Sequence, residues 1–171
     1  MRITAVNGDG SVMGTAYSNN AKTAYLGWYG GQDDHAFFTF SPVNLPRGAR
    51  VVGAWLRVQA ADSGSPGCLL RVSGFAQDHA APVSGYSDWQ SRPRTVAEVS
   101  WAPEEWSRNA WFSSPDLTAI VQEIVDRDGW SPGRGLGLTL GPASGNAGQR
   151  SLFQRDQGAA NAAELIVDYV P

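Results

Sequence analysis

The sequence contains very little cysteine, lysine and histidine. Cys68 is the single cysteine among 171 residues, which excludes an intramolecular disulfide and a cysteine-based zinc cluster. It stands in the apolar run CLLRV, which predicts a buried and unreactive thiol. Lys22 is the single lysine and there are 2 histidines. Because a zinc site needs three or four protein ligands, two histidines without cysteine do not indicate one.

Long apolar runs and an excess of basic charge are also missing. The N-terminal stretch MRITAVNGDGSVMG has no apolar segment of the kind found in secretory signals, and no segment is apolar enough to span a bilayer. We expect no signal peptide and no membrane insertion, so the chain either is not exported by that route or has lost its leader. The net charge of −3 and the pI near 5.3 argue against a nucleic-acid partner, because domains that bind nucleic acids are usually basic.

The sequence also lacks the common catalytic motifs. It has no G-x-S-x-G turn for a serine nucleophile, and the glycine-rich stretch GPASGNAG (141–148) lacks the lysine of a phosphate loop. His35 follows Asp33 and Asp34, but it directly precedes the strand-like AFFTF, which predicts an edge or turn histidine. The sequence therefore predicts a protein that is not an enzyme.

The sequence has many short runs with apolar residues two positions apart, which is the pattern of half-buried β-strands. In RVVGAWLRVQ (50–59), Val52, Ala54, Leu56 and Val58 are predicted to share the buried face. The other predicted strands cover 23–29, 36–40, 68–75, 96–101, 134–140, 151–156 and 164–170.

Turn signals such as ADSGSPG and GWSPGRG separate these runs. This arrangement predicts an all-β fold, an antiparallel jelly-roll-like β-sandwich formed by a single domain over 1–171. Residues 1–22 are expected to form an N-terminal arm or a first strand. Residues 76–115 lack periodicity and are expected to form a long tryptophan-rich excursion.

One segment, about 115–128, predicts an amphipathic helix. Its residues Leu117, Ile120, Val121, Ile124 and Val125 follow helical spacing and form one apolar stripe. The ends predict Ser114 as the N-cap, Pro115 at the first helical position, Asp116 in the first turn and Gly129 as a left-handed C-terminal residue. We also expect an ion pair between Glu123 and Arg127 on a solvated polar face, and a helix that closes one end of the sandwich.

Metal binding is a weaker hypothesis. DRDG (126–129) does not have the spacing of an EF-hand loop, because its glycine comes too early and no glutamate follows. The acidic stretch QDD (32–34) leaves a structural calcium ion possible, with Asp33 and Asp34 as ligands. No other cofactor is indicated.

Seven tryptophans are many for a chain of this length, and four of them lie between 89 and 111. Aromatic rings beside Arg can stack on sugars, can anchor a protein interface, or can form a small core beneath a loop. The core interpretation is favoured for Trp101 and Trp111. The candidate binding residues are Tyr86, Trp89, Arg92, Arg94, Trp106 and Arg108.

Three segments together resemble the DNRLRE-type β-sandwich modules. They are DDHAFFTFSPVNLPRGARVVGAWLRV, SWAPEEWSRNAWFSSPDLTAIVQEIVDRDGW and LFQRDQGAANAAELIVDYV, and the likeness extends over about residues 23–170. The resemblance implies a non-catalytic jelly-roll-like sandwich with a helix across one end, of a kind found in extracellular proteins, in carbohydrate-binding modules and in phage structural proteins. The basic residues of the motif are replaced here by DDHAFF, which argues against polyanion binding at that strand.

Two functions follow from these observations. The first is a structural component of a phage virion, as a capsid decoration or tail protein, which contacts protein neighbours or host-surface glycans and can be oligomeric. The alternative is a carbohydrate-binding module of a secreted polysaccharide-degrading enzyme or an adhesin. Both place the protein on a virion or an extracellular surface.

Overall fold

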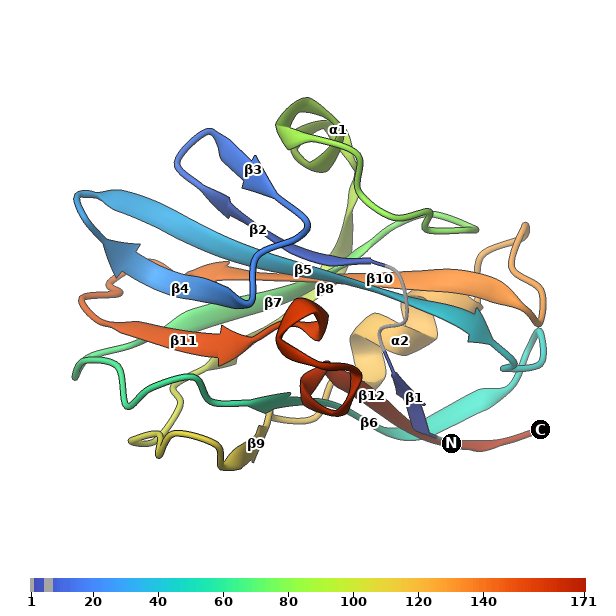
Figure 1. Cartoon of the computed structure of the whole chain (residues 1–171). Helices are drawn as coiled ribbons and strands as arrows, with labels where there is room; N and C mark the ends of the chain where they lie inside the picture. The colour runs from blue at the N-terminus through green and yellow to red at the C-terminus, as the bar shows by residue number, and fades with distance from the viewer. Residues whose placement is uncertain (1, 5–7) are drawn as a thin grey trace.

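A computed structural model describes residues 2–4 and 8–171, with the side chains of 2–4 and of Tyr29 left out. Two antiparallel sheets dominate the fold (Figure 1). The strands are β1 (Arg2–Thr4), β2 (Asp9–Met13), β3 (Ala16–Ser18), β4 (Thr23–Tyr29), β5 (Gln32–Val43), β6 (Arg50–Gln59), β7 (Leu70–Phe75), β8 (Arg94–Trp101), β9 (Trp111–Ser113), β10 (Arg134–Pro142), β11 (Gln149–Phe153) and β12 (Glu164–Val170). The helices are α1 (Tyr86–Ser91) and α2 (Thr118–Val125), with short 3-10 turns η1 (Arg155–Gln157) and η2 (Ala159–Asn161).

The smaller sheet has the strand order β1-β12-β6-β9. The larger sheet runs β11-β4-β5-β10-β7-β8, and the hairpin of β2 and β3 joins it through β5. The long strand β5 pairs with β10 from Ala36 to Val43 and with β4 from Gln32 to Asp34. The predicted all-β antiparallel sandwich with one amphipathic helix is confirmed.

The two sheets enclose one large apolar core. Phe38 and Phe40 of β5, Leu56 of β6 and Leu138 of β10 are among its fully buried side chains. Each strand supplies alternate residues to this core, as the period of two in the sequence predicts. Cys68 is also buried, and burial raises the pKa of its thiol, as expected for an unreactive cysteine.

The alternation predicted for β6 is wrong at Val52, the first residue of the set that is predicted to be buried. Val52 is 49% exposed, and Val51 is the residue that is buried. The pairing with β12 shifts between Asp168, which is opposite Gly53, and Tyr169, which is opposite Val51. Val52 is thus the extra residue of a β-bulge, and a bulge reverses the face that the following side chains occupy.

Helix α2 bridges β6 of the smaller sheet and β8 of the larger sheet. The predicted stripe of Leu117, Ile120, Val121, Ile124 and Val125 is fully buried. Gln122 accepts a hydrogen bond from the N–H of Val51 at 2.7 Å and donates one to the carbonyl of Ala49 at 3.1 Å. Its neighbour Glu123 accepts hydrogen bonds from the amides of Val96 and Ala97 of β8, both at 2.8 Å. The polar side of α2 therefore ties β6 to β8.

Several details predicted for the helix ends are wrong. The helix begins at Thr118, after the non-helical Leu117, and not at Pro115. Asp116 supplies the first side-chain acceptor, since its Oδ1 receives hydrogen bonds from the N–H and the hydroxyl of Thr118. Ser114 does not cap the helix, because its hydroxyl accepts from the N–H of Leu56 in β6. Ser114, which the local sequence predicts as the helix cap, therefore binds the backbone of β6 instead.

The predicted ion pair of Glu123 with Arg127 is also absent, because both residues bind elsewhere. Glu123 binds the edge of β8, and Arg127 donates to the carboxylate of Asp78 at 2.6 Å. Gly129 is not in the left-handed region. A Cβ there would lie 2.1 Å from a carboxylate oxygen of Asp78, so the close approach of that side chain requires glycine at this position.

The segment 76–115 is more ordered than the sequence predicts. It contains α1, the whole of β8 and the short strand β9. Residues 1–22 likewise hold three short strands, β1, β2 and β3, within the described part. Figure 1 shows α1 and the β2–β3 hairpin side by side above the larger sheet. They cover one part of its outer face, the face turned away from the core.

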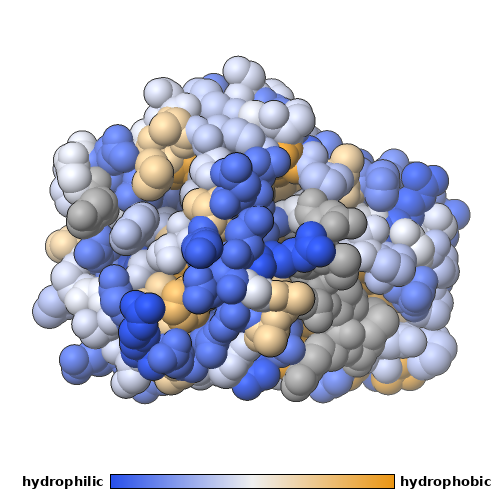
Figure 2. All heavy atoms as spheres, viewed as in Figure 1, coloured by the Kyte–Doolittle hydropathy of each residue, from blue (hydrophilic) through white to orange (hydrophobic). Residues whose placement is uncertain are grey.

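A second, smaller apolar cluster lies on that outer face. It contains Val12, Phe37, Phe75, Ala80 and Val83, with Tyr17, Tyr86 and Trp89 packed against it. The molecular surface in this view is mostly hydrophilic, with small separate apolar patches (Figure 2). None of the helices in the described residues is long and apolar enough to span a membrane.

Candidate ligand-binding groove

A groove of about 430 Å³ lies on the outer face of the larger sheet, beside α1. Its floor comes from neighbouring strands β5, β10, β7 and β8, and one wall comes from Trp89 of α1. The lining residues are His35, Arg71, Ser73, Trp89, Arg94, Glu98, Thr139, Gly141 and Pro142. Since alternate residues of a strand share a face, the lining side chains of β7 (Arg71 and Ser73) and of β8 (Arg94 and Glu98) come from outward-facing positions of their strands.

Trp89 is held in place by contacts on several sides. Its indole N–H donates to Oγ1 of Thr139 at 3.1 Å, and that hydroxyl donates in turn to the carbonyl of Ala36 at 3.1 Å. The ring centroid lies 4.9 Å from that of His35 and 6.1 Å from that of Tyr86. A wall fixed in this way loses little conformational entropy when a ligand binds against it.

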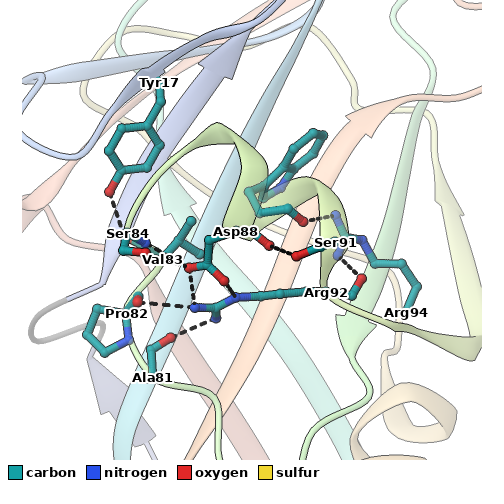
Figure 3. A network of polar contacts seen from close by, with 10 residues as sticks. Tyr17, Ala81, Pro82, Val83, Ser84, Asp88, Ser91, Arg92 and Arg94 are labelled. Carbon is teal, nitrogen blue, oxygen red and sulfur yellow. Dashed lines mark hydrogen bonds and ion pairs between the residues drawn. The ribbon is translucent and has the colours of Figure 1, made fainter.

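Helix α1 has no fully buried residue, and polar contacts supplement the packing of Tyr86 and Trp89 against the smaller apolar cluster. Arg92 and Asp88 form an ion pair at 2.8 Å, and Arg92 also donates to the carbonyls of Ala81 at 2.7 Å and Pro82 at 3.1 Å (Figure 3). The hydrogen bonds from Arg92 lower the pKa of Asp88 to about 2. Tyr17 of the β2–β3 hairpin donates its hydroxyl to the carbonyl of Val83 in the same network.

Arg94 joins α1 to the groove. Its guanidinium donates to the carbonyls of Arg92 at 2.6 Å and Trp89 at 2.9 Å, and it lies 4.9 Å from the ring centroid of Phe75. Burial, and then the neighbouring charge of Arg92, lowers the pKa of Arg94, which still leaves a guanidinium charged at neutral pH. Among the described residues, no carboxylate lies within ion-pair distance of Arg94.

The other charged groups of the groove balance one another. Arg71 and Glu98 form an ion pair at 3.4 Å, with about half of each side chain exposed. An exposed pair of this kind contributes little to stability, so either partner can turn to a ligand at small cost. Burial lowers the pKa of His35 to about 4, so its imidazole is neutral at pH 7 and offers one donor and one acceptor.

Five of the six predicted binding residues separate into three groups. Trp89 and Arg94 line the groove. Tyr86 and Arg92 lie behind it, where Tyr86 packs against Trp89 and Arg92 anchors α1. Arg108 lies elsewhere, since it donates to the carbonyl of Ala61 and covers the ring of Phe153.

Trp106 belongs to the core, so its prediction as a binding residue is wrong. It is 1% exposed, stacked on Phe112 at 5.2 Å and tilted against Trp101 at 5.9 Å. Arg150 covers the loop before it, because its guanidinium donates to the carbonyls of Pro103 and Glu104. The core interpretation is confirmed for Trp101, which is 5% exposed, whereas Trp111 is half-buried under Arg57.

The calcium hypothesis meets a geometric obstacle. Asp33 is exposed, whereas Asp34 is fully buried on the other face of β5. Successive residues of a strand point in opposite directions, so the two carboxylates do not converge on one ion. The described residues also contain no group of three or more His, Cys, Asp or Glu side chains placed to hold a metal.

His35 and six other lining residues were not predicted as site residues. His35 is not an edge or turn histidine, because it lies inside β5, opposite Val12 of β2. Gly141 brings β10 close to it, since a Cβ there would lie 1.8 Å from Nδ1 of the imidazole. The alternation of each strand marks these positions as outward-facing, but only the strand order places them together.

No protein-family model matches this chain, and no curated protein sequence is detectably similar to it. The resemblance to DNRLRE-type modules therefore stays a prediction from the sequence.

Proposed function

We propose that this protein is a non-enzymatic β-sandwich that binds carbohydrate in the groove beside α1. The observation that carries the proposal is the fixed indole of Trp89, which forms a wall beside the polar side chains of β5, β7, β8 and β10. A volume of about 430 Å³ is in the range of sites for small organic ligands. An aromatic wall with polar groups around it suits a sugar ring, which has apolar C–H faces and hydroxyls at its edge.

The polar lining suits hydroxyl groups because it offers both donors and acceptors. Arg94 and Arg71 are donors, and the carboxylate of Glu98 is an acceptor. The neutral imidazole of His35 supplies one of each. Most of these groups project from strands, which position side chains more rigidly than loops do.

The same lining supports binding in preference to hydrolysis. Glycoside hydrolases commonly place two carboxyl groups on either side of the bond that they cleave. Glu98 is the sole carboxylate among the described lining residues, and it is paired with Arg71. An acid and a base with separated pKa values are therefore not provided by this groove.

The proposal is tested by titrating the protein with soluble glycans and following tryptophan fluorescence and heat of binding. The panel contains laminarin, xylan, glucomannan, alginate and bacterial capsular polysaccharides. We expect at least one of them to bind with a Kd below about 1 mM and to change the emission of Trp89. The absence of binding across the panel, with correctly folded protein, would contradict the proposal.

A place in a phage virion remains a prediction from the sequence and is compatible with glycan binding, since a virion surface protein can bind its host through glycans. Size-exclusion chromatography with light scattering tests the assembly role directly. A ring or another symmetric oligomer would support that role. A monomer that binds glycan would favour the alternative of a carbohydrate-binding module.

A further inference from the structure

One aromatic side chain outside the groove is not explained by the fold. Trp28 of β4 is 51% exposed and is the sole aromatic among the exposed large hydrophobic residues of the described chain. The other tryptophans with described burial are buried or half-buried. A tryptophan that is left half in water is a common sign of a surface that contacts a ligand or a partner.

The strand register places Trp28 on the same face as the groove. Trp28 is directly opposite Asp33 of β5, and directly opposed residues of two antiparallel strands point to the same side. Asp33 and His35 share the outer face, because Asp34 between them is fully buried. Trp28 is therefore a diagonal neighbour of His35, with Cα atoms roughly 7–8 Å apart.

The backbone between Trp28 and the groove is continuous. Pro142 lines the groove, and the loop that follows it returns to β4, where the carbonyl of Gly148 accepts a hydrogen bond from the N–H of Trp28 at 3.1 Å. Figure 1 shows this loop and the β4–β5 turn at the same end of the molecule, opposite the two termini.

A glycine fixes the outward direction of Trp28. Leu26, two residues earlier, is fully buried in the core, so regular alternation would also turn Trp28 inward. Gly27 adopts a φ of 97°, and a Cβ there would lie 2.4 Å from the carbonyl oxygen of Gly148. This irregular residue reverses the alternation and places the indole on the outer face.

We propose that Trp28 is a second stacking platform of the groove, and that the ligand is therefore an oligosaccharide chain that passes from Trp89 over His35 to Trp28. This inference rests on the proposed function. Along β5, Trp28 is opposite Asp33, and Thr139, the hydrogen-bond partner of Trp89, is opposite Phe37. His35 lies between these two positions, so a chain that contacts both rings passes over the imidazole. A single sugar unit engages one ring at a time.

The experiment compares wild-type protein with Trp28→Ala by calorimetry, using laminari-, xylo-, manno- and alginate oligosaccharides of increasing length. Wild-type affinity should rise with chain length until both rings are covered. Trp28→Ala should bind the longest oligosaccharides about tenfold more weakly, a loss of about 1.4 kcal/mol, and the shortest ones as well as wild type. Val52→Ala, which alters an exposed residue of the other sheet, is the control and should match wild type at every length.

The outcomes separate the two proposals. If Trp28→Ala binds every length as tightly as wild type, the second platform is refuted while carbohydrate binding stands. If wild-type protein binds none of the oligosaccharides and none of the polysaccharides, both proposals fail. An equal loss at all lengths would also refute the platform, since it would show that Trp28 acts on the groove as a whole.

Discussion

The indole N–H of Trp89 donates a hydrogen bond to Oγ1 of Thr139 at 3.1 Å, which joins α1 to the middle of the larger sheet. The bond matters because no residue of α1 is fully buried, although Tyr86 and Trp89 pack against the smaller apolar cluster. The orientation of the groove wall therefore depends on a few polar contacts together with this partial apolar packing. These contacts can be removed one at a time without disturbing the core of the sandwich.

The contribution of this hydrogen bond is tested by Thr139→Val, which keeps the shape of the side chain and removes the acceptor. The part-buried indole N–H then loses its protein partner, and a hydrogen bond of this kind contributes about 0.5–1.5 kcal/mol. We expect a several-fold loss of glycan affinity and a modest fall in Tm. Thr139→Ser, which keeps the hydroxyl, should retain most of the affinity. Equal affinity for the valine variant and wild type would show that the bond does not orient the wall.

Trp106 provides a contrasting prediction. Because it is 1% exposed and packed between Phe112 and Trp101, Trp106→Ala should destabilise the fold by about 3–5 kcal/mol. For a chain of this size each kcal/mol lowers Tm by roughly 2–4 °C. Thermal unfolding measures the effect. A Tm within a degree or two of wild type would contradict the core position of Trp106.

Asp34 predicts a pH effect on stability. Asp34 is fully buried, and one of its carboxylate oxygens is without a hydrogen-bond partner in the described structure. Burial raises the pKa of this carboxyl group to about 6. The folded state thus favours the protonated form, so the stability that Asp34 contributes is present below pH 3.8 and is lost as the pH rises through about 6.

Asp34→Asn removes this titration. The variant should be more stable than wild type at pH 7.5, by about 1 kcal/mol after allowance for solvent screening, and the difference should disappear near pH 4. Urea unfolding at the two pH values measures it. A difference that does not change with pH would contradict a raised pKa at Asp34.

The sequence predicts most of the core because each core element has its own period. The bounds of β4, β6 and β12 coincide with the predicted ranges, and the apolar stripe of α2 is buried as expected. The ends of α2 were predicted less well. Local rules predict that Ser114 caps the helix and that Glu123 pairs with Arg127, but both side chains bind strands that are distant in the sequence.

The groove was predicted only in part, for a physical reason. Trp89 and Arg94 stand out because aromatic and basic residues cluster near them in the sequence. His35, Arg71 and Glu98 are single outward-facing residues of three separate strands, and their proximity depends on a strand order that alternation does not determine. Helix α1 was missed because a helix of 6 residues without a buried face has no apolar stripe.

The central claim is that Trp89 forms the wall of a carbohydrate site, and Trp89→Ala tests it most directly. The measurement is the Kd of the best glycan of the panel, by calorimetry, for wild type, Trp89→Ala and the control Val52→Ala. The account predicts a loss of at least tenfold for Trp89→Ala, or about 1.4 kcal/mol, with Val52→Ala unchanged. A Trp89→Ala variant that is folded and binds as tightly as wild type would contradict it.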